Sequence, residues 1–239
     1  MKNPITIAAM LIAGLVSIAQ AQQITQTRTF GPQIPQYSTV MNFDSYAGDL
    51  DDIESIVITW EMDIKDGFLV VDNDSPDPAT GNYEFGASIS VDGANTDVTI
   101  LNNSFGAIFT ATEVINSGSF SLAGNDGDGS NDYSPDGPDG ISVDGQDVSG
   151  NGGDTINSMF YDQYVSGTGG SAGATFNIGI TAEQYLNVTS NGGTEYAITP
   201  VNASGIVTLV YNLKPEAIPE PSSAAMLALG SLVLLRRRR

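Results

Sequence analysis

The chain has 239 residues, of which 28 are acidic and 8 are basic, and it contains no histidine and no cysteine. These counts exclude a Ser-His-Asp triad, a cysteine nucleophile, a zinc site of the usual nitrogen and sulfur ligands, and disulfide bonds. The net charge of −20 also argues against nucleic-acid binding, because contacts to phosphate depend on lysine and arginine. Any chemistry therefore falls to carboxylates, hydroxyls and the backbone.

The charges are distributed unevenly along the chain. Five of the eight basic residues lie at its two ends, whereas 27 of the 28 acidic residues lie between Asp44 and Glu216. The basic residues at the ends are Lys2, Arg236, Arg237, Arg238 and Arg239. The body of the protein is therefore more acidic than the whole chain.

Residues 1–21 have the pattern of a secretory signal peptide. Lys2 supplies a minimal charged region, an apolar stretch runs from Ile5 to Ile18, and Ala19-Gln20-Ala21 matches a cleavage site that predicts a mature start at Gln22. The alternative is a buried N-terminal helix. The apolar stretch is too short for a comfortable membrane span, so we expect export and cleavage by signal peptidase.

Residues 22–217 predict one all-β domain, an antiparallel β-sandwich of the jelly-roll or immunoglobulin-like kind. Apolar residues alternate with polar ones over 56–64, 83–91, 175–180 and 206–213, which is typical of strands with one packed and one wet face. Trp60 falls on the apolar face of the first of these strands, so we expect it in the core. Seven Asp-Gly steps, together with Asn151-Gly152 and Asn191-Gly192, predict frequent turns.

Residues 124–154 form an acidic insertion rich in aspartate and glycine, with no convincing strand pattern. Four oxygen-bearing side chains recur there at alternate positions, which suits a loop wrapped around Ca²⁺. They are Asp126, Asp128, Ser130 and Asp132. The EF-hand pattern fails at position six, which is Asn131, and at position twelve, which is Gly137. The alternative is a solvated, flexible loop. A weaker acidic cluster, Asp72, Asp74 and Asp77, follows an apolar run over 68–71.

Residues 218–239 combine three parts in a fixed order. Pro219, Glu220 and Pro221 come first, an apolar run over 224–235 follows, and Arg236–Arg239 end the chain. Prolines keep the first part extended and accessible. At about 1.5 Å per residue, the helix expected over 222–235 spans roughly 21 Å, which is short of the ~30 Å hydrocarbon core.

This tail resembles the PEP-CTERM sorting signal of Gram-negative bacteria, which an exosortase recognises. The resemblance implies export, transient retention in the inner membrane by the short transmembrane helix, cleavage near Pro219, Glu220 and Pro221, and transfer to the cell surface or extracellular matrix. The arginines would stay on the cytoplasmic side. The alternative is a C-terminal membrane anchor that is not cleaved.

Two stretches of the body resemble the choice-of-anchor E domain family of bacterial surface proteins. Phe43-Asp44 followed by Gly48 and Leu50 is similar to that family's early signature, and 205–211 is similar to its closing strand. The residues 51–55 and the acidic insertion depart from the family pattern. The resemblance implies an exported β-rich domain without assigned catalysis.

Three functional classes are compatible with these features. We expect a non-catalytic surface or matrix protein associated with exopolysaccharide or biofilm, because it needs only a folded sandwich and two sorting signals. A secreted carbohydrate-binding module would stack sugars on exposed aromatic residues, for which Trp60, Tyr37, Tyr46 and Tyr133 are the candidates. A glycoside hydrolase would need a matched pair of carboxylates in a cleft, and the sequence selects no such pair.

Overall fold

The computed structural model describes residues 22–127, 133–135, 137–167 and 173–215. One compact unit comprises Gln23–Leu213. The predicted signal peptide (1–21) and sorting signal (218–239) lie outside the described residues. Within the described part of the chain, no helix is long and apolar enough to cross a membrane.

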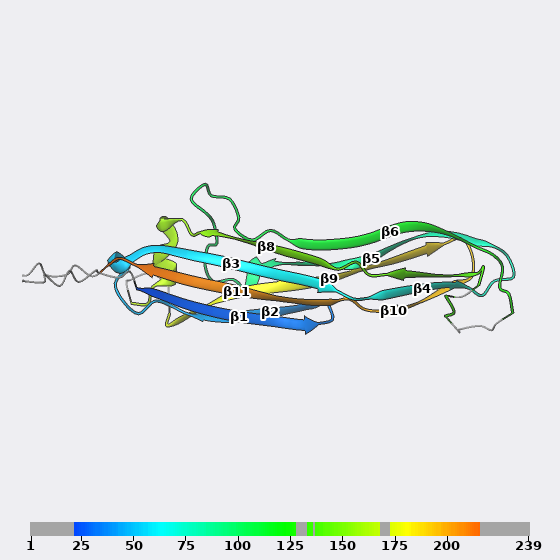
Figure 1. Ribbon diagram of the computed structural model, residues 1–239, viewed down its shortest axis with the longest axis horizontal. Coiled ribbons are helices and arrows are strands. Elements are labelled where there is room, and N and C mark those ends of the chain that lie inside the picture. Colours follow the sequence, from blue (N-terminus) through cyan, green and yellow to red (C-terminus); the bar gives the residue numbers. More distant parts are fainter. Residues whose placement is uncertain (1–21, 128–132, 136, 168–172, 216–239) are drawn as a thin grey trace, which may run out of the picture. The chain divides into compact units, whose positions relative to one another are not determined.

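The compact unit is built of antiparallel strands, as the alternating pattern predicts (Figure 1). The elements found in the described residues are β1 (Gln23–Gln33), β2 (Tyr37–Asp44), the 3-10 helix η1 (Leu50–Asp52), β3 (Ile53–Lys65), β4 (Phe68–Asn73), β5 (Ala79–Asp92), the 3-10 helix η2 (Gly93–Asn95), β6 (Thr112–Leu122), β7 (Gly140–Asp144), β8 (Val148–Thr155), the 3-10 helix η3 (Ser158–Tyr164), β9 (Thr175–Ser190), β10 (Thr194–Thr199) and β11 (Asn202–Leu213).

The strands form three sheets in a sandwich-like arrangement. Their orders are β1-β11-β3-β8, β10-β4-β7 and β2-β9-β5-β6. Every ladder between these strands is antiparallel. The all-β, antiparallel, sandwich-like prediction is therefore confirmed.

The first two sheets continue one another along the chain. β4 follows β3 after two residues and β10 precedes β11 by two, so the β3–β11 ladder ends at Lys65↔Asn202 and the β4–β10 ladder starts at Phe68↔Thr199 (Figure 1). Asp66 and Gly67 fill the gap on one strand with φ of 64° and 97°. Asp-Gly tolerates this left-handed conformation. This Asp-Gly step therefore offsets one strand from the next and does not close a hairpin.

The hydrophobic core lies between this layer and the β2-β9-β5-β6 sheet. From β3, the side chains of Ile56, Ile58, Met62 and Ile64 are fully buried, and Trp60 is 3% exposed. They join one cluster with partners from the opposite sheet that include Phe43, Phe85, Ile89, Ile178 and Ile180. Burying each large apolar side chain contributes about 1.5–3 kcal/mol. The period-2 alternation thus identified the core face correctly, and Trp60 is a core residue as expected.

The structure corrects the prediction that 124–154 lacks strands. β7 pairs with β4, and β8 pairs with β3 over eight residues. β8 reads VSGNGGDT, so it has almost no apolar side chains to alternate. Its Gly152 lies directly opposite Trp60 in the ladder, where a Cβ would come within 2.9–3.0 Å of the indole ring. Asn151-Gly152, expected to be a turn, is inside this strand because glycine leaves room for the tryptophan.

Replacing Gly152 by alanine is therefore expected to destabilise the protein. The added methyl group must displace a buried indole that is held by neighbours on every side, and overpacking of this kind costs about 1–3 kcal/mol. Gly93→Ala is the matched control, because a Cβ at Gly93 meets no heavy atom of the described residues within 4 Å, its chain neighbours aside. Urea unfolding of both variants measures the difference. Equal midpoints for the two variants would contradict the role of Gly152.

Candidate cation sites

Three acidic side chains meet at the end of the β4–β10 ladder. Glu195 lies directly opposite Asp72 in the register, and Asp74 follows two residues later. One carboxylate oxygen from each of the three residues lies within 4.8 Å of the others. Asp72 is 1% exposed, and Asp74 and Glu195 are half-buried. Like charges directly across a ladder are destabilising, and grouped carboxylate oxygens are the ligands that Ca²⁺ and Mg²⁺ prefer.

The turn that carries Asp74 is held by a fully buried asparagine. Asn73 Nδ2 donates to the carbonyl oxygens of Asp77 (2.9 Å) and Ala123 (2.6 Å), and its Oδ1 accepts a hydrogen bond from the Ser75 N–H (3.1 Å). These bonds tie the end of β4 to the end of β6. Asp72 and Asp74 are the chain neighbours of Asn73, so these hydrogen bonds also fix the backbone that carries both carboxylates.

The sequence identified only part of this cluster. The structure brings Asp72 and Asp74 together, as the spacing suggested, but the third member among the described residues is Glu195 and not Asp77. Glu195 lies far along the chain in β10, so only the strand register reveals it. The local sequence Thr194-Glu195-Tyr196 does not distinguish Glu195 from an ordinary solvent-exposed glutamate.

A second acidic pair lies at the start of β7. The Asp126 N–H donates to Asp139 Oδ2 at 2.6 Å, and Asp139 is 1% exposed. A Cβ placed on Gly137 would lie 2.8 Å from Asp139 Oδ1 and 3.3 Å from Asp126 Oδ2. Both carboxylates therefore flank the same small space beside the glycine. In the sequence, Asp139 is distinguished only as the first residue of one of the seven Asp-Gly steps.

Of the four side chains predicted to bind Ca²⁺, the structure describes one. Asp126 lies in the described chain, whereas Asp128, Ser130 and Asp132 lie outside the described residues. The segment that follows returns to the sheet, because the carbonyl oxygen of Ser134 lies 2.1 Å from the position of a Cβ on Gly140. Gly140 pairs with Asp72, so the acidic insertion passes beside the β4 cluster.

The aromatic residues considered for sugar stacking are mostly engaged within the protein. Trp60 Nε1 donates to the Ile108 carbonyl oxygen (3.1 Å), and its ring stacks on Phe109 with centroids 5.9 Å apart. The Tyr37 hydroxyl donates to the Ala203 carbonyl oxygen (3.1 Å), and burial raises the pKa of Tyr37. Tyr46 packs against Tyr211. Tyr133, at 38% exposed, is the most open of the four candidates.

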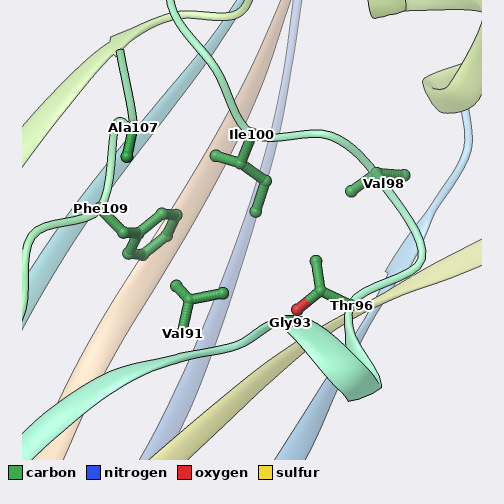
Figure 2. Close-up of a pocket in the computed structure, with 7 residues that line it drawn as sticks. All are labelled: Val91, Gly93, Thr96, Val98, Ile100, Ala107 and Phe109. Carbon is green, nitrogen blue, oxygen red and sulfur yellow. The ribbon is translucent and has the colours of Figure 1, made fainter.

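An apolar pocket of about 230 Å³ lies beside η2 (Figure 2). Side chains that include Val91, Ile100 and Phe109 line it. Thr96 is the polar side chain in its lining, and its hydroxyl already donates to the Asp92 carbonyl oxygen and accepts from the Gly179 N–H. The pocket therefore offers van der Waals contact more than hydrogen bonding.

Comparisons with known proteins give no family for this chain. No protein-family model matches it, and neither does any curated protein. Among solved structures, it is similar to the infectious bursal disease virus Gx strain at 12% identity and a TM-score of 0.17, covering 83% of this chain and 36% of that chain. It is similar to the T13 particle of the same virus at 12% identity and a TM-score of 0.19, covering 92% and 47%. The chain spans less than half the length of each.

Replacing Asn73 by alanine is expected to destabilise the protein by about 2–4 kcal/mol. The change removes three hydrogen bonds of a buried side chain, two to the carbonyl oxygens of Asp77 and Ala123 and one from the Ser75 N–H, and each contributes about 0.5–1.5 kcal/mol. Chemical denaturation measures the loss. Asn82→Ala serves as the control, because Asn82 is exposed and substitutions at such sites usually change stability by less than about 0.5 kcal/mol. A loss no greater than that of the control would show that Asn73 does not hold the turn.

Proposed function

We propose that this protein is an exported, non-catalytic component of the cell surface or extracellular matrix, sorted by an exosortase-type system and associated with exopolysaccharide or biofilm. Signal peptidase would remove residues 1–21, the tail at 218–239 would hold the protein transiently in the inner membrane, and exosortase would cut near Pro219–Pro221. Its domain would be a jelly-roll or immunoglobulin-like sandwich of the choice-of-anchor kind. The alternatives are a carbohydrate-binding module and, with less support, a glycoside hydrolase.

The observation that carries the proposal is the pairing of the first strand with the last. Gln23 of β1 lies opposite Asn212 of β11, and Gln23 Nε2 donates to Asn212 Oδ1 at 2.8 Å. Both ends of the folded unit therefore leave from the same end of one ladder. A domain with this arrangement can fold completely while a signal at either end is still held in a membrane.

The predicted cleavage points also precede β1 and follow β11, the first and last strands of the described chain. Cleavage before Gln22 comes one residue ahead of β1, and β11 ends at Leu213, six residues before Pro219. Removing both signals would break none of the ladder hydrogen bonds. The mature domain would keep the same sheet and core as the precursor, which favours processing after folding.

The acidic clusters support a structural role more than catalysis. Glycoside hydrolysis needs two carboxylates that face a cleft able to admit a sugar. Asp72 and Asp139 are each 1% exposed, so a polymer does not reach their oxygens. Buried carboxylates of this kind suit a bound cation, and the wider acidic surface suits hydration and solubility.

The mass of the mature protein recovered from its host tests the proposal. The expected product begins at Gln22 and ends near Pro219–Pro221, and it is found at the cell surface or in the medium. Replacing both Pro219 and Pro221 by alanine should leave the tail attached and the protein in the membrane fraction, because the extended recognition segment is lost.

Pro215→Ala is the matched control for this test, since it alters a proline between β11 and the motif. It should be processed like the unchanged chain. An intact tail on the unchanged surface protein would instead indicate a permanent anchor. Hydrolysis of the host exopolysaccharide by the purified protein would overturn the non-catalytic assignment, and saturable binding to that polymer would favour the carbohydrate-binding alternative.

A further inference from the structure

Asp139 has a carboxylate oxygen that is closed to solvent and accepts no hydrogen bond from the described residues. The whole residue is 1% exposed, and Oδ1 is the atom without a donor, whereas Oδ2 accepts from the Asp126 N–H. Leaving a buried charged group without compensation costs several kcal/mol. A positive partner would stabilise the ionised form of this carboxyl, and the described residues donate no hydrogen bond to Oδ1.

Asp139 Oδ1 faces the space beside the Cα of Gly137. The position of a Cβ on that glycine is 2.8 Å from Asp139 Oδ1 and 3.3 Å from Asp126 Oδ2, and these are the atoms of the described residues, chain neighbours aside, that lie within 4 Å of it. The two carboxylates thus converge on space that a side chain at position 137 would occupy. Convergent oxygen atoms around a small open space are the basic geometry of a hard-cation site.

We propose that Asp126 and Asp139 together bind one divalent cation, Ca²⁺, at the base of the acidic insertion. Ca²⁺ accepts carboxylate ligands in irregular arrangements, whereas Mg²⁺ requires a nearly ideal octahedron. The site differs from the EF-hand pattern in the residue that supplies the last acidic ligand of the loop. Position twelve of that pattern is Gly137, and the acid comes two residues later, from Asp139 at the entrance to β7.

The position of this pair gives the cation a structural effect. Asp139 lies beside the Asp72↔Gly140 rung, and its carbonyl oxygen accepts from the Asn73 N–H at 3.0 Å. Asp126 belongs to the segment that leaves β6. A cation between the two carboxylates would therefore fasten the start of the acidic insertion to its end, next to the β4 strand. The nearby charges of Asp72, Asp74 and Glu195 would strengthen the attraction through their summed potential.

Calcium titration of the full chain tests the site. The chain is purified in mild detergent, freed of cations with EDTA, and titrated with CaCl₂ while heat is recorded. We expect a saturable signal with a dissociation constant below about 1 mM, as for extracellular calcium modules. At a tenfold excess over that constant, the melting temperature should rise by about 3–6 °C. NaCl at equal ionic strength should not reproduce the rise, because it only screens charge.

Two conservative variants assign the binding to this pair. Asp139→Asn keeps an acceptor for the Asp126 N–H, and Asp126→Asn leaves that backbone donor in place, so both should melt close to the unchanged chain in EDTA. Each should bind Ca²⁺ at least tenfold more weakly. Asp144→Asn, at an exposed position in β7, the strand that follows Asp139, removes the same charge and should bind normally.

Three outcomes would overturn the proposal. The first is the absence of a saturable heat in the unchanged chain. The second is normal Ca²⁺ affinity in both Asp139→Asn and Asp126→Asn. The third is loss of binding in Glu195→Gln while Asp139→Asn still binds, which would place the ion at the β4–β10 cluster. None of these results bears on the sorting of the protein, because the sorting signals are outside the site.

Discussion

The antiparallel pairing of β3 with β11 is the constraint on which the rest of this structure depends. The ladder runs from Ile53↔Leu213 to Lys65↔Asn202, places the alternating apolar residues of both strands on one face, and makes β11 a central strand with β1 on its other side. Its continuation through the β4–β10 ladder places Asp72 beside Glu195. This register therefore sets the core and, through its continuation, the position of the acidic cluster.

Buried hydroxyls join the layers across this ladder. Tyr211 of β11 donates to the carbonyl oxygens of Tyr164 (3.1 Å) and Asp44 (3.3 Å), and Tyr164 donates to that of Thr99 (2.8 Å). Burial raises the pKa of both phenols, so both remain neutral donors throughout the physiological range. They give η3 and the end of β2 fixed positions against β11. In a chain without disulfides, such buried polar contacts supply directional specificity that apolar packing does not.

The same fold concentrates negative charge at one place. Among the described residues, Arg28 and Lys65 form ion pairs with Asp44 and Asp63, far along the chain from the acidic insertion. Neither of these ion pairs involves the carboxylates near β4 and β7, where we propose a bound cation. Such a cation would let a long acidic segment fold back onto the sheet against its own repulsion.

The sequence by itself determined the all-β class and the core faces of the long strands, because burial on one face of a sheet requires alternation in the chain. The spacing of oxygen-bearing side chains predicted Asp126 as a cation ligand. Only the tertiary structure revealed β8, since its sequence is rich in glycine and polar residues and leaves no apolar alternation, and Gly152 is there to leave room for Trp60. Only the tertiary structure brought Glu195 to Asp72 and Asp139 to Asp126, because strand register and a returning loop, neither encoded in local spacing, decide which distant carboxylates become neighbours.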